Sequence, residues 1–261
     1  EYLNEASNIN VPMALHFAEN DQFAPMASVN NIQAALKDHV ETKIFIYPGV
    51  DHGFSRNESV HFHKSTAQLA HQRSIALFRK TMGPHYDFSQ LWDKHCEYEF
   101  ATRDADATME TMVSEPYVNH IPTMTGGVGY EHLKRFYKHH FIPQTPQDTS
   151  LIPISRTIGE GILVDEMLFC FTHDIEIDWM LPGIKPTGKR VEIPLVAIVK
   201  FRGDKLHNEH IYWDQASVLV QIGLLDPTGL PVAGIETAKK LLDEQLPSNQ
   251  LMAKWDHSEE K

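Results

Sequence analysis

NEHIYWDQASVLVQIG, residues 208–223, decides the fold of most of this chain. Its apolar residues alternate with polar ones and are mostly β-branched or aromatic, which is typical of a strand with one buried face. We expect a strand over 205–222 that includes all of this stretch except its final glycine. Strict alternation puts His210, Tyr212 and Asp214 on one face, and Glu209, Ile211 and Trp213 on the other. A bulge, common in curved sheets, would change that parity.

Further strands precede this one. RVEIPLVAIVKF, residues 190–201, reads as a long strand, and Gly203-Asp204 supplies the turn that joins it to 205–222 as a hairpin. Residues 151–161 and 162–174 form a second predicted hairpin around a glycine-containing turn. The second half of the chain is therefore predicted to be mainly antiparallel sheet.

Three predicted helices come before these strands, at 88–103, 104–113 and 130–141, with an extended segment at 115–122 and a turn at 126–129. Helices followed by long antiparallel strands predict an α+β fold. We expect a cone in which a curved sheet wraps around the three helices.

Residues 85–222 resemble the SnoaL-like branch of the NTF2-like superfamily. The resemblance rests on ATRDADATMETM (101–112), YVNHIP (117–122), the helix at 130–141 and the closing stretch at 208–223. It implies the cone fold. The family includes polyketide cyclases, dehydratases and isomerases, together with non-catalytic partners.

The resemblance also implies an apolar pocket in which a buried carboxylate moves protons to and from carbon. Asp214 matches the family's acidic residue on the last strand and is the leading candidate. His120 lies on the segment that lines the pocket mouth in similar proteins, and His210 could share a proton with Asp214. Tyr117 and Trp179 are the expected aromatic walls. The alternative is that Asp214 accepts hydrogen bonds from a helix end and Trp179 is a core residue.

The first third of the chain has a different pattern. Two short apolar runs, VPMALHFA (11–18) and KIFIYP (43–48), read as buried strands with a helical pattern between them, and a closing helix is predicted at 64–82. Asp21 follows the first strand and His52 follows the second. This order of an acid and then a histidine after successive strands is that of a hydrolase triad.

Residues 9–82 resemble the end of a dienelactone hydrolase, the carboxymethylenebutenolidase family. The strand followed by Asp21, the Pro25 turn, YPG at 47–49, HGF at 52–54 and the closing helix carry the resemblance. It implies an incomplete α/β-hydrolase segment in which Asp21 orients His52. In the family that histidine activates a cysteine on a Gly-x-Cys-x-Gly elbow.

No Gly-x-Ser/Cys-x-Gly elbow occurs in the 261 residues. Only 20 residues precede Asp21, and the first residue is Glu rather than Met, so we expect a fragment of a longer protein. Without the nucleophile and oxyanion hole this chain should not hydrolyse esters.

Composition limits the remaining possibilities. A net charge of −12 argues against a nucleic-acid surface, and no apolar run is long enough for a membrane helix. Two cysteines in 261 residues fit a reducing, cytoplasmic compartment. The 16 histidines are not spaced as a zinc site, so neither a metal nor another cofactor is expected.

The domain organisation predicted is a partial hydrolase segment (1–84), a SnoaL-like domain (85–222) and a tail (223–261) with one helix near 234–245. Three functions stay open: a dienelactone-hydrolase-like fragment with a small-molecule-binding domain, a SnoaL-like cyclase, isomerase or dehydratase acting on a cyclic carbonyl compound, and a non-catalytic binding or dimerisation module. The expected partners are a small apolar or aromatic carbonyl ligand and a second copy of the chain, paired through the curved sheet.

Overall fold

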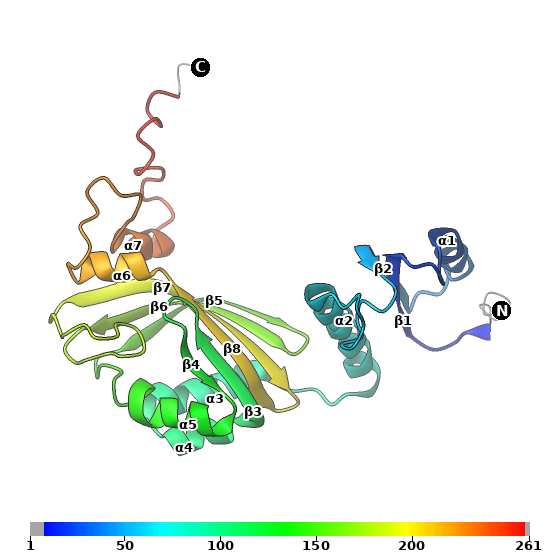
Figure 1. The fold of residues 1–261 in the computed structure, drawn as a ribbon, viewed down its shortest axis with the longest axis horizontal. Coiled ribbons are helices and arrows are strands. Elements are labelled where there is room, and N and C mark those ends of the chain that lie inside the picture. Colours follow the sequence, from blue (N-terminus) through cyan, green and yellow to red (C-terminus); the bar gives the residue numbers. More distant parts are fainter. Residues whose placement is uncertain (1–7, 259–261) are drawn as a thin grey trace. The chain divides into compact units, whose positions relative to one another are not determined.

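The computed structural model describes residues 8–258 and separates into two compact units at the junction of His85 and Tyr86 (Figure 1). Each unit has a sheet of its own. No helix within residues 8–258 combines the length and the apolar character that crossing a membrane requires.

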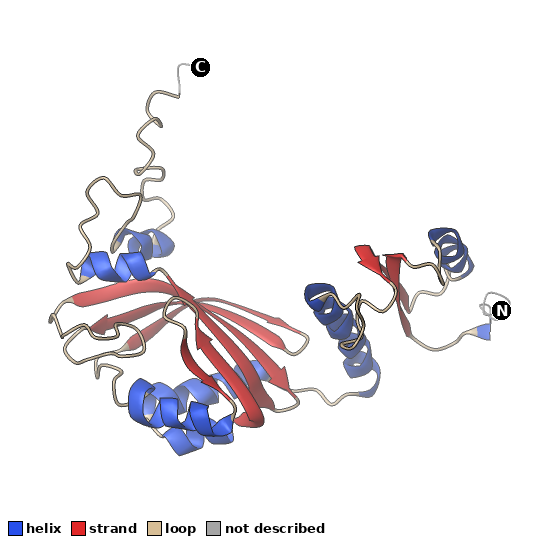
Figure 2. Cartoon of the chain, viewed as in Figure 1, coloured by secondary structure: helices blue, strands red, loops and turns tan. Residues whose placement is uncertain are grey.

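The first unit contains two strands and two helices (Figure 2). They are β1 (Met13–Asn20), α1 (Met26–Ala35), β2 (Thr42–Asp51) and α2 (Lys64–Met82). β1 and β2 pair in parallel, and the pairing becomes irregular after Ala18. Asp21 therefore follows the carboxyl end of β1, while His52 follows that of β2. Parallel pairing brings these two ends to the same edge of the sheet.

The core of the first unit is small. Its buried apolar residues are Ala18, Tyr47, Val50, Phe54 and Ala70. Both strands of the two-stranded sheet have one edge without a partner strand among the described residues. Parallel sheets are normally covered on both faces and extended by further strands. The unit thus has the architecture of one part of a larger α/β sheet.

In the part of the chain that the structure describes, the second unit is a six-stranded sheet with three helices against its inner face and two further helices, described below, on the other side (Figure 1). The helices of the inner face are α3 (Phe88–Cys96), α4 (Ala105–Glu110) and α5 (Tyr130–Phe136). The strands are β3 (Met112–His120), β4 (Thr125–Val128), β5 (Ser150–Gly159), β6 (Ile162–Thr172), β7 (Arg190–Arg202) and β8 (Lys205–Trp213). Their spatial order is β4-β3-β8-β7-β6-β5, and β3–β8 is the parallel pair. This confirms the predicted α+β cone, with one parallel pairing in an otherwise antiparallel sheet.

Two of the helices end in a π-helical turn. α3 continues into Glu97–Ala101, where the Thr102 amide donates to the Glu97 carbonyl at 2.9 Å. α5 continues into Tyr137–Phe141 in the same way. π turns are rare and are frequently found at functional sites. Here both turns place side chains on the inner face of the unit, where the helices meet the sheet.

The strand predicted over 205–222 is too long, because β8 ends at Trp213 and residues 215–221 form helix α6 (Gln215–Gln221). Asp214 caps this helix: its side chain accepts a hydrogen bond from the Ala216 amide at 2.9 Å. Capping by an aspartate favours a helix start. The β-branched residues after it nevertheless suit a helix here because Val218 packs in the core.

Residues 126–129 were predicted as a turn, yet Gly126 and Gly127 belong to β4. A Cβ atom on Gly126, whose φ is +136°, would lie 2.1 Å from the Val118 carbonyl oxygen. One on Gly127 would lie 2.8 Å from the Leu133 backbone. Glycine thus allows β4 to fit between β3 and α5.

The tail packs on the second unit and adds helix α7 (Glu236–Leu242). Ala238 lies against Leu168 and Cys170 on the outer face of β6. The Ser217 hydroxyl also donates to the Gly234 carbonyl at 2.9 Å. α7 therefore covers part of the outer face of the sheet, and the pairing of two chains through this face stays a prediction.

Candidate active site

The inner face of the second unit encloses a mainly apolar cavity of about 40 Å³. On this scale one water molecule needs about 10–15 Å³, so a ligand of one ring requires the lining side chains to move. The flexible Met167 is one of them. The other lining residues are Trp92, Cys96, Glu99, Phe100, Val118, His120, Tyr137, Phe141, Leu151, Phe169, Trp179, Leu195, Ala197, Glu209 and Ile211.

A histidine and two glutamates form a buried cluster at this cavity. His95 lies on α3, Glu99 lies on the following π turn, and Glu209 lies on β8. Their exposed fractions are 0%, 4% and 2%. His95 Nε2 is 3.0 Å from Glu99 Oε1 and 3.3 Å from Glu209 Oε1. Helical spacing of four residues aims His95 and Glu99 in the same direction, and β8 supplies Glu209 from across the cavity wall.

The surroundings of this cluster change its proton affinities. Burial raises the pKa of Glu209 to about 7, opposed by the charge of His95 and assisted by that of Glu99. Burial lowers the pKa of His95, but the charges of Glu99 and Glu209 outweigh it, so that its pKa is raised overall. Glu209 therefore takes up a proton close to neutral pH at this position.

His120 lies on β3 and is also buried against the cavity. Its Nδ1 is 3.2 Å from the Thr125 carbonyl oxygen, so that nitrogen carries the hydrogen and donates it. Burial lowers the pKa of His120 to about 4 despite this bond. The side chain is thus a neutral imidazole near neutral pH, packed among Phe136, Phe141 and Trp179.

Two buried polar atoms at the cavity have no hydrogen-bond partner among the described residues: Trp179 Nε1 and Glu209 Oε1. The 3.3 Å contact of Glu209 Oε1 with His95 is close enough for ion pairing but lacks hydrogen-bond geometry. An unsatisfied buried donor or acceptor costs about 1–3 kcal/mol. One donor and one acceptor left open at the same apolar cavity are what a small ligand with a polar end would satisfy.

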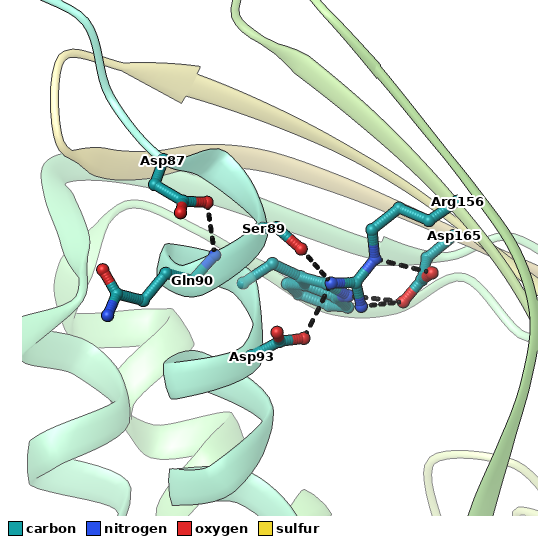
Figure 3. A network of polar contacts seen from close by, with 7 residues as sticks. Asp87, Ser89, Gln90, Asp93, Arg156 and Asp165 are labelled. Carbon is teal, nitrogen blue, oxygen red and sulfur yellow. Dashed lines mark hydrogen bonds and ion pairs between the residues drawn. The ribbon is translucent and has the colours of Figure 1, made fainter.

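A polar clamp holds the wall beside this cluster (Figure 3). The Asp165 carboxylate on β6 accepts hydrogen bonds from Arg156 Nε and Nη2, at 3.0 and 2.8 Å, and from Trp92 Nε1 at 2.9 Å. Arg156 Nη1 also donates to Ser89 Oγ and Asp93 Oδ1 on α3. The clamp joins β5 and β6 to α3 and fixes Trp92 in the cavity wall.

Two of the predicted pocket residues, His120 and Trp179, line the cavity. Three others do not. Asp214 is exposed and caps α6, which is the alternative given for it from the sequence. Tyr117 and His210 contact each other edge to face at 5.6 Å, on neighbouring strands outside the cavity.

The alternation along β8 explains this difference. The β7–β8 pairing runs without a shift from Lys200↔Asn208 to Leu195↔Trp213, so parity is kept. The inner face then carries Glu209 and Ile211, while His210 and Tyr212 point outward. The apolar residues alternating with Glu209 were the signal that this was the buried face. For His95 and Glu99 the signal was their position among Trp92 and Cys96 at helical spacing.

The ligand atoms of His95, Glu99 and Glu209 lie within 4.8 Å of one another, a spacing that a metal ion could bridge. The donor set of one imidazole and two carboxylates suits several divalent ions. However, the 3.0 Å separation of His95 Nε2 and Glu99 Oε1 is a hydrogen-bond distance. A proton accounts for this contact without a metal.

The first unit brings its two predicted residues together. His52 Nδ1 lies 2.8 Å from Asp21 Oδ2, and Asp21 Oδ1 accepts hydrogen bonds from the amides of Phe23 and Ala24. Partial burial opposes ionisation of Asp21, but these bonds hold its pKa below the usual value. The His52 side chain is 60% exposed. An oriented imidazole with an open second nitrogen is the arrangement of a triad base.

Comparison with known proteins separates the two units. Residues 1–82 match the Dienelactone hydrolase family, which confirms the resemblance predicted for the first unit. Over 81 residues the chain is 38% identical to a provisionally assigned carboxymethylenebutenolidase of Azospirillum brasilense. This match covers 31% of the chain and 35% of that relative. The chain thus spans about a third of the relative's length.

Solved structures similar to this chain include NTF2-like and SnoaL-like proteins. TsrD from Streptomyces laurentii is 17% identical with a TM-score of 0.44, over 54% of this chain and all of TsrD. An NTF2-like protein from Burkholderia pseudomallei is 16% identical with a TM-score of 0.40, over 52% and 96% of the two chains. A provisionally assigned SnoaL-like polyketide cyclase from Jannaschia is 15% identical with a TM-score of 0.42, over 55% and 100%. The fold assignment itself rests on the sheet order and helices described above.

Proposed function

We propose that the second unit binds a small carbonyl compound in its cavity and moves a proton to or from the carbon next to the carbonyl group. Glu209 is the base. The observation that carries this proposal is that Glu209 lines an apolar cavity and that its buried oxygen Oε1 lacks a hydrogen-bond partner. The apolar lining favours a compact, mostly hydrocarbon ligand, which enters as side chains such as Met167 move.

The proton transfer uses the two open polar atoms. Glu209 Oε1 takes the proton as the C–H bond breaks, and the electron pair moves onto the carbonyl oxygen as an enolate. Trp179 Nε1 donates a hydrogen bond to that oxygen, and such a donor stabilises developing charge in a water-poor site. Glu209 then returns the proton to carbon. A pKa of about 7 makes Glu209 a stronger base than an ordinary carboxylate and leaves it mostly ionised at pH 8.

Hydrogen exchange tests this function without knowledge of the natural substrate. Cyclohexanone and 2-cyclohexenone are incubated with the whole chain in D₂O at pH 8. The hydrogens next to the carbonyl group should exchange for deuterium, and proton NMR follows the loss of their signals. Glu209→Gln should slow the exchange about 100-fold or more, because it removes the base. Trp179→Phe, which keeps a ring and removes the N–H, should cost about tenfold.

Asp214→Asn is the matched control for this experiment. It changes a carboxylate of the same strand region that is exposed and outside the cavity, and asparagine still caps a helix. Its exchange rate should equal that of the wild type. Exchange that survives Glu209→Gln, or that is absent from the wild type, contradicts the proposal.

A second candidate function is favoured by the His52–Asp21 contact of 2.8 Å. We propose that the first unit supplies the acid and the histidine of a lactone or ester hydrolase whose nucleophile lies on a segment that this chain does not contain. The exposed side of His52 is where that nucleophile would approach. The hydrogen bonds on Asp21 keep its carboxylate ionised and His52 oriented.

Fusing the missing part tests the hydrolase proposal. The chain alone should hydrolyse p-nitrophenyl acetate no faster than buffer. A fusion that adds the part of the Azospirillum brasilense relative preceding the matched 81 residues should gain activity. His52→Ala in the fusion should then lower the rate about 100-fold or more, because the base is lost. His61→Ala, which removes an exposed histidine paired with Asp51, is the control and should have little effect.

A further inference from the structure

The contacts of His95 determine which of its ring nitrogens carries a hydrogen. His95 Nδ1 lies 2.6 Å from the Thr111 hydroxyl oxygen, and that hydroxyl donates its hydrogen to the Thr108 carbonyl at 2.6 Å. A hydroxyl has one hydrogen, so Thr111 accepts from His95. Nδ1 is therefore the N–H of the ring, and Nε2 is the nitrogen whose proton content can change.

Nε2 faces the two carboxylates. Glu99 Oε1 is 3.0 Å away and Glu209 Oε1 is 3.3 Å away, while the Tyr137 hydroxyl lies at 3.4 Å. With both carboxylates ionised, a neutral ring would present the Nε2 lone pair to two negatively charged oxygens, which is repulsive. A proton on Nε2 turns both contacts into attractions.

The other groups around His95 do not supply the missing positive charge. Trp92 stacks on the ring at 5.6 Å, and the indole N–H of Trp92 is engaged by Asp165. Cys96 follows on α3, and its thiol is kept protonated because burial and the charges of Glu99 and Glu209 raise its pKa. Burial and the same two carboxylates also raise the pKa of Tyr137. Arg156, the cation of the neighbouring clamp, is engaged by Asp165 and Asp93.

We propose that His95, held in one tautomer by Thr111, carries a proton at Nε2 between Glu99 and Glu209, and that this cation keeps Glu209 ionised as the base. The inference rests on the proposed function for its catalytic meaning. Its physical reason is that burial and the charge of Glu99 favour the protonated form of Glu209, and a carboxyl group that already holds a proton cannot accept another. His95 is a positioning residue, because it acts on the ligand only through Glu209.

Carboxyl ¹³C NMR of the ligand-free chain measures this directly. The titration midpoint of Glu209, assigned by its loss in Glu209→Gln, should rise by about one pH unit or more in His95→Gln. Thr111→Val, which keeps the side-chain shape and removes the acceptor of Nδ1–H, should move it in the same direction by less. His210→Gln is the matched control: it changes the residue next to Glu209 on the other face of β8 and should leave the midpoint in place.

Ring ¹⁵N NMR gives a second measurement on the unaltered chain, which applies even where His95→Gln does not fold. Both nitrogens of His95 should be protonated at pH 7, and a neutral ring at that pH overturns the proposal. So does an unchanged Glu209 midpoint in a folded His95→Gln or Thr111→Val variant. Stoichiometric metal in the purified chain by elemental analysis also overturns it, since a metal ion would then balance the carboxylates. A shifted midpoint in a chain that does not exchange ketone hydrogens supports the role of His95 and rejects the proposed function alone.

Discussion

Arg156→Met should lower the free energy of unfolding of the second unit by about 2–3 kcal/mol. The substitution leaves the Asp165 side chain, which is 8% exposed, with the Trp92 indole as its remaining partner in the clamp. Breaking a buried ion pair by removing one partner costs about 3–5 kcal/mol, and the 25% exposure of the Arg156 side chain reduces this figure. Urea unfolding followed by tryptophan fluorescence measures the change.

Comparison variants separate the clamp from surface charge. Asp93→Asn removes an exposed partner of the same arginine and should cost less than about 1 kcal/mol. Arg190→Met, in an exposed pair with Asp148, should also stay below about 1 kcal/mol. The double variant Arg156→Met/Asp165→Leu should recover part of the loss, because no charge is left unpaired. Equal effects of Arg156→Met and Arg190→Met would contradict a role of burial.

The free energy of unfolding of Glu209→Gln, taken relative to that of the wild type, should increase by about 3 kcal/mol between pH 4.5 and pH 8. The folded pKa of Glu209 is raised from 4.5 to about 7, so the folded chain binds a proton that the unfolded chain has released. The stability from this proton is fully present below pH 4.5 and is lost as pH rises through 7. Glutamine has no such proton to lose.

The pKa of His120 also differs between the folded and unfolded chain, so the wild-type stability curve contains more than the Glu209 effect. The quantity to measure is therefore the difference in free energy of unfolding between the wild type and Glu209→Gln at each pH. The folded pKa of His120 is lowered from 6.5 to about 4, so its contribution is lost as pH falls from 6.5 through 4. Between pH 4.5 and 6.5 the two effects oppose each other in the wild type. Unfolding of wild type and Glu209→Gln at pH 4.5, 6.5 and 8 removes the contribution of His120 from the comparison, and Glu192→Gln on the outer face serves as control. A difference that does not vary with pH would contradict the raised pKa.

Much of the fold could be predicted because its signals are local. The apolar periodicity of 64–82 matches α2, and the two hairpins follow from alternating strands beside glycine turns. The predicted end of the last strand was wrong for a reason that is only partly local. Residues 216–220 have strand propensity, but the Asp214 cap and the burial of Val218 favour a helix, and propensity alone does not report burial.

The candidate site could be predicted only in part. His120 and Trp179 were identified, whereas Asp214 was chosen by resemblance to a family position and lies outside the cavity. The alternation placed Glu209 on one face with Ile211 and Trp213, and Glu209 and Ile211 line the cavity. That pattern shows which residues share a face but does not show what the face contacts.

The sequence by itself determined which residues share a face of one element: Glu209 with Ile211 on β8, and His95 with Glu99 on α3 and its π turn. It also determined that Asp21 and His52 follow successive strands. The shared faces follow from periods of 2 and 3.6 residues, which depend on neighbours along the chain. Only the tertiary structure decided that Glu209 and His95 meet, and that Trp179 and Glu209 are left without hydrogen-bond partners at one cavity. Those properties depend on segments far apart in the chain, because burial and the proton affinities that follow from it arise when the sheet closes over the helices.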